Sequence, residues 1–123
     1  MSTKNKSEEL FTNLRFNLES IKNKEGVIGY ILRNSKSASV DLNDPTKIID
    51  YAILSAESLD TGEIASEIFQ LGSINSVIIE GNEVKVLSLV IDDQRLSIFM
   101  DKKIDHNKIS KELESTKHNQ RRN

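Results

Sequence analysis

Residues Asp44–Gly72, DPTKIIDYAILSAESLDTGEIASEIFQLG, predict one long helix with recognisable signals at both ends. Asp44 can accept hydrogen bonds from the first free amides of a helix, and Pro45 suits the first helical position. Gly72 follows Leu71 at the point where a left-handed residue commonly ends a helix. We therefore expect a helix over residues 45–71.

This helix carries two apolar stripes rather than one. The first has the alternating spacing of four and three that is typical of helix-on-helix packing, and it consists of Ile48, Ala52, Ser55, Leu59, Gly62, Ser66 and Phe69. The second is broader and consists of Ile49, Ile53, Ala56, Ile64, Ile68 and Leu71. One stripe can cover the chain's own sheet, and the other then needs a different partner. Two alternatives stay open: a wholly buried helix, or a break at Asp60–Glu63, which fits a loose capping box.

Composition indicates one soluble domain of ordinary size. The chain has 123 residues, of which 37% are hydrophobic and 29% are charged. A net charge of −2 gives no electrostatic footprint for nucleic acid. No apolar run approaches the roughly 20 residues of a membrane span, and the polar start MSTKNKSEELF lacks the apolar core of a signal peptide. Without cysteine there is no disulfide framework, so we expect a cytoplasmic protein.

The rest of the chain predicts an opening helix, two strands before the long helix, and three strands with a short helix after it. Leucines and an isoleucine at helical spacing mark the opening helix, and apolar runs bounded by turn residues mark the strands. The strands are expected at Val27–Leu32, Ser37–Leu42, Ser76–Glu80, Glu83–Ile91 and Arg95–Asp101, and the last helix near Asp105. Residues 1–6 and 115–123 are polar and expected to be disordered, which leaves one domain over residues 7–114.

Two strands carry more specific information. Gly29 interrupts the first strand and indicates a close neighbour or a bulge. Residues Val84–Ile91 are largely apolar on both alternating faces, and such a strand belongs to a sheet that is covered on both sides. The long helix can cover one side of this sheet and the first helix the other.

No residue pattern indicates catalysis or a bound cofactor. The two histidines, His106 and His118, make a weak case for a metal without cysteine. Asp41, Asp44 and Asp50 are explained by a strand end, a helix cap and a first helical turn. Neither a nucleophile elbow nor a phosphate-binding glycine loop occurs. We expect no catalytic, cofactor-binding or metal-binding residue and interpret the protein as non-enzymatic.

The sequence indicates association with another chain more clearly than it indicates catalysis. Residues Val77, Ile78 and Ile79 contain neither charge nor proline, so this strand would be an unguarded edge if it lies at the side of the sheet. In a two-fold dimer the strand can pair with its own copy while the long helix meets its copy along the small-residue stripe. The predicted interface is Val77, Ile78, Ile79, Ile48, Ala52, Ser55, Leu59, Gly62 and Ser66. The alternative is that another strand of the same chain covers this edge.

Together these features resemble the roadblock family of dynein light chains and small-GTPase regulators. The matching features run from about Leu10 to Leu113. They are the segment GVIG at 26–29, the long helix ending in Leu71-Gly72, the hairpin VIIEGNEVKVLSLV, and the closing segment LSIFMDKKIDHNKI. The chain departs from the family in its first hairpin turn, where Arg33–Lys36 replaces the frequent Asp and Gly, and in the helix interruption at Thr61-Gly62.

The resemblance implies an α+β fold of the roadblock or profilin-like type. The family's sheet has five antiparallel strands, with the long helix on one side and the terminal helices on the other, and its members dimerise through the third strand and the long helix. The resemblance implies a scaffold or regulator whose partners are a second copy or a related roadblock chain, and a Ras-like small GTPase. A different function, sensing of a small molecule held between sheet and helix, is the alternative. An enzymatic function lacks any residue that can be named as nucleophile or base.

Overall fold

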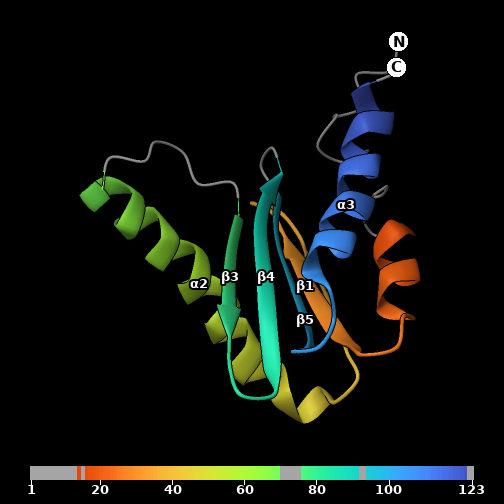
Figure 1. Cartoon of the computed structure of the whole chain (residues 1–123). Helices are drawn as coiled ribbons and strands as arrows, with labels where there is room; N and C mark the ends of the chain where they lie inside the picture. Colours follow the sequence, from red (N-terminus) through yellow and green to blue (C-terminus); the bar gives the residue numbers. More distant parts are fainter. Residues whose placement is uncertain (1–13, 15, 70–75, 92–93, 122–123) are drawn as a thin grey trace.

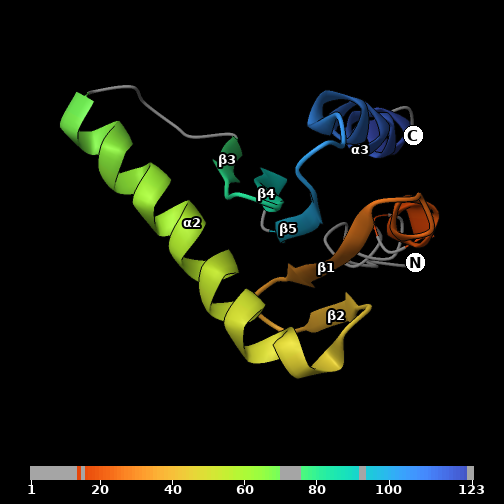
Figure 2. The same cartoon turned by 60° about the horizontal axis from the view of Figure 1, so that its bottom comes forward.

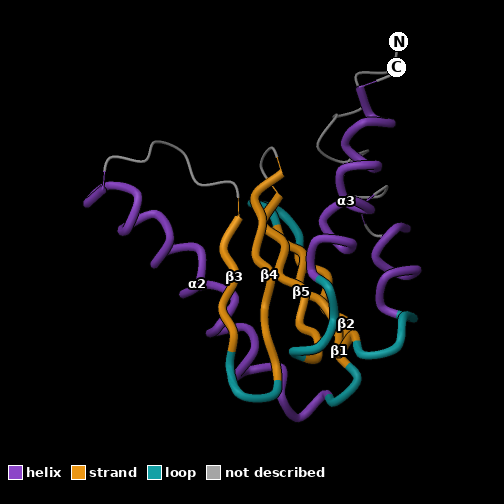
Figure 3. The backbone as a smooth tube through the Cα atoms, viewed as in Figure 1, coloured by secondary structure: helices purple, strands orange, loops and turns teal. Residues whose placement is uncertain are grey.

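The computed structural model of the chain describes residues 14, 16–69, 76–91 and 94–121. Its centre is a five-stranded sheet in the order β2-β1-β5-β4-β3, in which each neighbouring pair is antiparallel (Figures 1 and 3). The strands are β1 Val27–Arg33, β2 Ala38–Leu42, β3 Ser76–Glu80, β4 Val84–Ile91 and β5 Gln94–Asp101. A 3-10 turn, η1 Pro45–Lys47, leads into α2 Ile48–Phe69, and α3 His106–Arg121 ends the described chain. The predicted fold class is confirmed.

The helices form a layer on each face of the sheet. Figure 2 shows α2 on one side, and α3 together with the helical residues 16–22 on the other. The larger core lies under α3 and the N-terminal helical residues, and includes Leu14, Leu18, Ile21, Leu32, Leu87, Leu96, Ile98, Met100, Ile109 and Leu113. The smaller core lies on the α2 side, where Tyr51 stacks on Phe99 with ring centroids 4.5 Å apart. Apolar residues on both faces of β4 and β5 are therefore buried, as the sequence of β4 predicts.

The N-terminal cap of the long helix is as predicted, because Asp44 accepts a hydrogen bond from the backbone amide of Thr46 at 3.1 Å. The hydrogen bonds from Thr46 also lower the pKa of the Asp44 carboxyl. The first turn is 3-10 rather than α-helical, and α2 then continues without a break through Thr61 and Gly62. The open alternative of a break at Asp60–Glu63 is therefore wrong. The predicted stop at Gly72 lies outside the described residues.

Gly29 is the point at which β1 changes register. Val27 pairs with Met100 and Gly29 with Phe99, so two residues of β1 span the place of one on β5. A Cβ at Gly29 would lie 2.2 Å from the carbonyl oxygen of Asp41 on β2. Both interpretations of this glycine, a bulge and a close neighbour, are confirmed.

The C-terminal helix is longer than the sequence predicts. α3 continues to Arg121, so residues 115–121 are helical where a disordered tail is expected. Once a helix has begun, each added residue gains a hydrogen bond, and a polar segment can extend it without a core of its own. The expected disordered segment at residues 1–6 lies outside the described residues.

A polar cluster lies on the α3 side of the sheet. The Lys22 ammonium forms an ion pair with Asp41, and the hydrogen bond to that carboxylate raises the pKa of Lys22. The Tyr30 hydroxyl donates to Glu19 at 3.3 Å, and only 2% of Tyr30 is exposed. Burial, assisted by the nearby carboxylates Glu19 and Asp41, raises the pKa of Tyr30.

The buried phenol gives a pH dependence of stability. Because the folded state raises the pKa of Tyr30, its contribution is fully present below the ordinary pKa of about 10 and is lost as pH rises through the folded value. The difference in phenolate absorbance between the wild type and Tyr30→Phe reports this titration. We expect a midpoint above the ordinary value. A midpoint at or below it would contradict the burial of this side chain.

Candidate interaction surface

The inward face of α2 packs on the sheet through serine hydroxyl groups. Ser55 Oγ lies 2.8 Å from Ser97 Oγ on β5, and Ser58 Oγ lies 2.7 Å from Ser88 Oγ on β4. Ser88 and Ser97 also bond each other at 2.8 Å. Each of these four hydroxyl groups therefore has a partner, as a buried polar group requires. Small side chains at this contact let the helix lie close to the sheet.

The outward face of α2 is also apolar. Four isoleucines on it expose more than half of their surface each: Ile49 74%, Ile53 53%, Ile64 56% and Ile68 68%. We call these four the outward isoleucine face. A helix of an isolated domain would place its largest apolar residues inward. This face is therefore an exposed apolar patch of the kind that marks a binding surface.

The same helix is strongly acidic. It carries Asp50, Glu57, Asp60, Glu63 and Glu67, all exposed, and no lysine or arginine. The outward isoleucine face thus lies among carboxylates. Its electrostatics favour a partner surface with positive charge at its rim.

Strand β3 lies at one edge of the sheet, next to the layer formed by α2. It pairs only with β4 within the described residues, and α2 contacts both strands. Val77 and Ile79 face the α2 side, because they pair with Ser88 and Val86, whereas Ile78 packs against the larger core. Within the described part of the chain, no other strand covers this edge, so the alternative of a covered strand is not observed. Figures 1 and 2 show the C-terminal end of α2 projecting beyond this edge.

The structure divides the predicted interface residues between two environments. Six of them are partly or well exposed: Val77, Ile78, Ile79, Ile48, Ala52 and Gly62. Ser55, Leu59 and Ser66 are at most 5% exposed. These three residues of the small-residue stripe face the chain's own interior, whereas Ile48, Ala52 and Gly62 of the same stripe do not. The assignment of the small-residue stripe and of β3 to a contact with a second copy stays a prediction.

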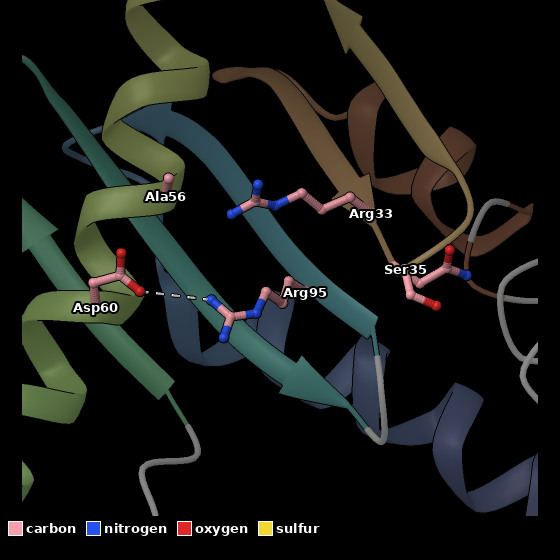
Figure 4. Close-up of a pocket in the computed structure, with 6 residues that line it drawn as sticks. Arg33, Ser35, Ala56, Asp60 and Arg95 are labelled. Carbon is pink, nitrogen blue, oxygen red and sulfur yellow. Dashed lines mark ion pairs between the residues drawn. The ribbon is translucent and has the colours of Figure 1, made fainter.

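A hollow of about 550 Å³ lies beside α2, between the helix and one end of the sheet. It is lined by Arg33, Asn34, Ser35, Ala56, Asp60 and Arg95. Figure 4 shows the side chains of Arg33 and Arg95 reaching from β1 and β5 toward α2, where an Arg95 Nη lies 3.9 Å from an Asp60 Oδ. The sequence pattern does not reveal this site, because Arg33 and Arg95 become neighbours only through the β1–β5 register.

Neither a metal site nor a membrane span is found in the described residues. No group of three or more His, Cys, Asp or Glu side chains there is arranged to hold a metal ion. Among the helices of that same part of the chain, none has the length and apolar character needed to cross a membrane.

Comparison with solved structures identifies the class of fold. The Roadblock/LC7 domain from Streptomyces avermitilis superposes with a TM-score of 0.66 at 14% identity, over 82% of this chain and 88% of that one. The gliding protein MglB from Thermus thermophilus gives 0.65 at 12% identity, over 87% and 84%. MglC from Myxococcus xanthus gives 0.51 at 22% identity, over 89% and 97%. No family model and no curated protein matches the sequence.

The chain therefore has the roadblock fold, and the resemblance drawn from its sequence is confirmed at the level of the fold. The identities lie between 12% and 22%, and the likeness is one of the arrangement of strands and helices.

Proposed function

We propose that this protein is a non-enzymatic scaffold or regulator that self-associates and binds a Ras-like small GTPase in the cytoplasm. The observation that carries the proposal is the outward isoleucine face beside the unpaired edge of β3. The roadblock fold supports it, because the family that the sequence resembles acts through protein contacts. Two of the similar structures are the gliding protein MglB and the protein MglC.

The two surfaces suit different contacts. The edge of β3 offers backbone N–H and C=O groups to a further strand, and Val77–Ile79 has no charged or proline residue to block this pairing. The outward isoleucine face offers apolar area, at roughly 25 cal/mol for each Å² removed from water. We propose that the β3 edge and the outward isoleucine face join two copies, and that the surface which the two α2 helices form together receives the GTPase.

Because α2 is acidic, the effect of salt distinguishes self-association from GTPase binding. Two copies that meet through α2 bring acidic helices together, so added salt should strengthen that contact by screening the repulsion. A GTPase with a basic patch should instead bind more weakly as salt increases. Any effect on GTP hydrolysis would come from placing the switch segments of the GTPase itself.

Affinity capture from the native cytoplasm tests the GTPase. The bait is the full chain, and the matched control bait carries Ile53→Lys, which adds a charge to the outward isoleucine face. We expect a small GTPase on the wild-type bait and its loss from the variant bait, identified by mass spectrometry. Recovery of the same GTPase by both baits would contradict the role of α2, and its absence from both would contradict the proposed partner.

A further inference from the structure

The hollow between α2 and the sheet has an arrangement of charge that the proposed partner contacts do not explain. Arg33 and Arg95 occupy directly opposite positions on the paired strands β1 and β5. Like charges at opposite positions of an antiparallel pair repel each other and destabilise the sheet. An isolated domain gains nothing from this pairing unless another group offsets the repulsion.

The described part of the chain supplies only part of that offset. Asp60 lies 3.9 Å from Arg95, and its side chain is 64% exposed, so this contact is long and solvated. Arg33 has no ion pair with another described residue. Among the described residues that line the hollow, two guanidinium groups and one carboxylate leave one positive charge in excess, in a chain whose net charge is −2.

We propose that this hollow binds the phosphate group of a small phosphorylated molecule through Arg33 and Arg95. A single guanidinium can satisfy both oxygens of a carboxylate by itself, whereas a phosphate monoester carries up to two charges and three acceptor oxygens. Phosphate is therefore the oxyanion that can use both arginines at once. The contact of Arg95 with Asp60 is long and solvated, so the guanidinium donors of Arg95 stay available to the phosphate.

The size and lining of the hollow fit this ligand class. Its volume of about 550 Å³ exceeds that of a bare phosphate and leaves room for an attached group. Asn34 is fixed in the β1–β2 turn, since its Oδ1 accepts from the backbone amides of Lys36 and Ser37, both at 2.8 Å. The turn that borders the hollow is therefore ordered before any ligand binds. This site does not depend on self-association or on a GTPase.

Arginine side-chain NMR of the full chain tests the proposal. The Nε–Hε signals are followed during titration with inorganic phosphate, free phosphoserine or AMP at constant ionic strength, with acetate as the carboxylate comparison. We expect saturable shifts of the Arg33 and Arg95 signals with at least one phosphate compound. Arg33→Gln or Arg95→Gln should weaken this binding by roughly tenfold or more, because each removes charge-assisted hydrogen bonds.

The control variant and a second measurement make the result decisive. Lys36→Gln removes an exposed cation of the same turn that does not line the hollow, and should leave the affinity within about twofold of the wild type. Phosphate should raise the unfolding temperature of the wild type more than that of Arg33→Gln. A tighter complex with AMP or phosphoserine than with inorganic phosphate would support the proposal and identify the attached group. No saturable shift with any phosphate compound, equal binding of acetate, or equal loss in Lys36→Gln would overturn it.

Discussion

Gly29→Ala should destabilise the fold by about 3 kcal/mol or more, because the added Cβ meets backbone atoms that cannot move aside. It would lie 2.2 Å from the Asp41 carbonyl oxygen and 2.7 Å from the Leu42 Cα, and the glycine has φ of +156°. Relief requires β1 and β2 to separate, which costs hydrogen bonds along their pairing. Thermal unfolding should show a decrease in Tm of roughly 10 °C or more.

Gly81→Ala is the matched control for this substitution. A Cβ at Gly81 would meet only the Val84 carbonyl oxygen, at 3.1 Å, in a surface turn. A shift of a few tenths of an ångström removes that contact, so we expect a much smaller loss of stability. Equal Tm values for Gly29→Ala and the wild type would show that the close approach of β1 to β2 is not as described.

Ile53→Lys combined with Ile64→Lys should abolish the association of this protein through α2. Each isoleucine contributes roughly 1.5–3 kcal/mol when it is fully buried by a partner, so the pair should raise Kd by about 100-fold or more. The isolated fold should tolerate both changes, because the two side chains are exposed and each new lysine has an acidic residue one turn away. Light scattering across a concentration series measures the loss.

The choice of lysine makes this result specific. Adding positive charge to an acidic helix reduces repulsion between two copies, so a loss of association would identify the apolar contact as its source. Ser20→Lys is the control, since Ser20 is exposed on the helix of the opposite layer. Equal weakening by Ser20→Lys, or no weakening by the double variant, would contradict the role of the outward isoleucine face.

Most of the fold could be predicted from the sequence because its signals are local. Asp44 and Pro45 define the start of the long helix, and turn residues bound each strand. Gly29 predicts a bulge from a single position, since a glycine inside a strand of branched and aromatic residues weakens that strand unless the backbone needs it there. The helical tail of α3 could not be predicted, because a polar segment carries no apolar pattern to reveal it.

The face of α2 that meets the sheet could not be predicted from the helix alone. Its two stripes both have helical spacing, and the serines of one stripe are polar residues that would also suit an exposed face. The deciding partners are Ser88 and Ser97, which stand between apolar residues of β4 and β5 and need buried hydrogen bonds. They become adjacent only through the β4–β5 register, and the same is true of Arg33 and Arg95 through β1–β5.

Sedimentation equilibrium of the unmodified full chain tests the central proposal most directly. A monomer has a mass of 13.9 kDa. At tens of micromolar we expect a species of twice that mass, formed through the β3 edge and α2, and a larger dimer fraction at higher salt, where the acidic helices repel each other less. A single species of 13.9 kDa at every concentration and salt level would contradict self-association through these surfaces.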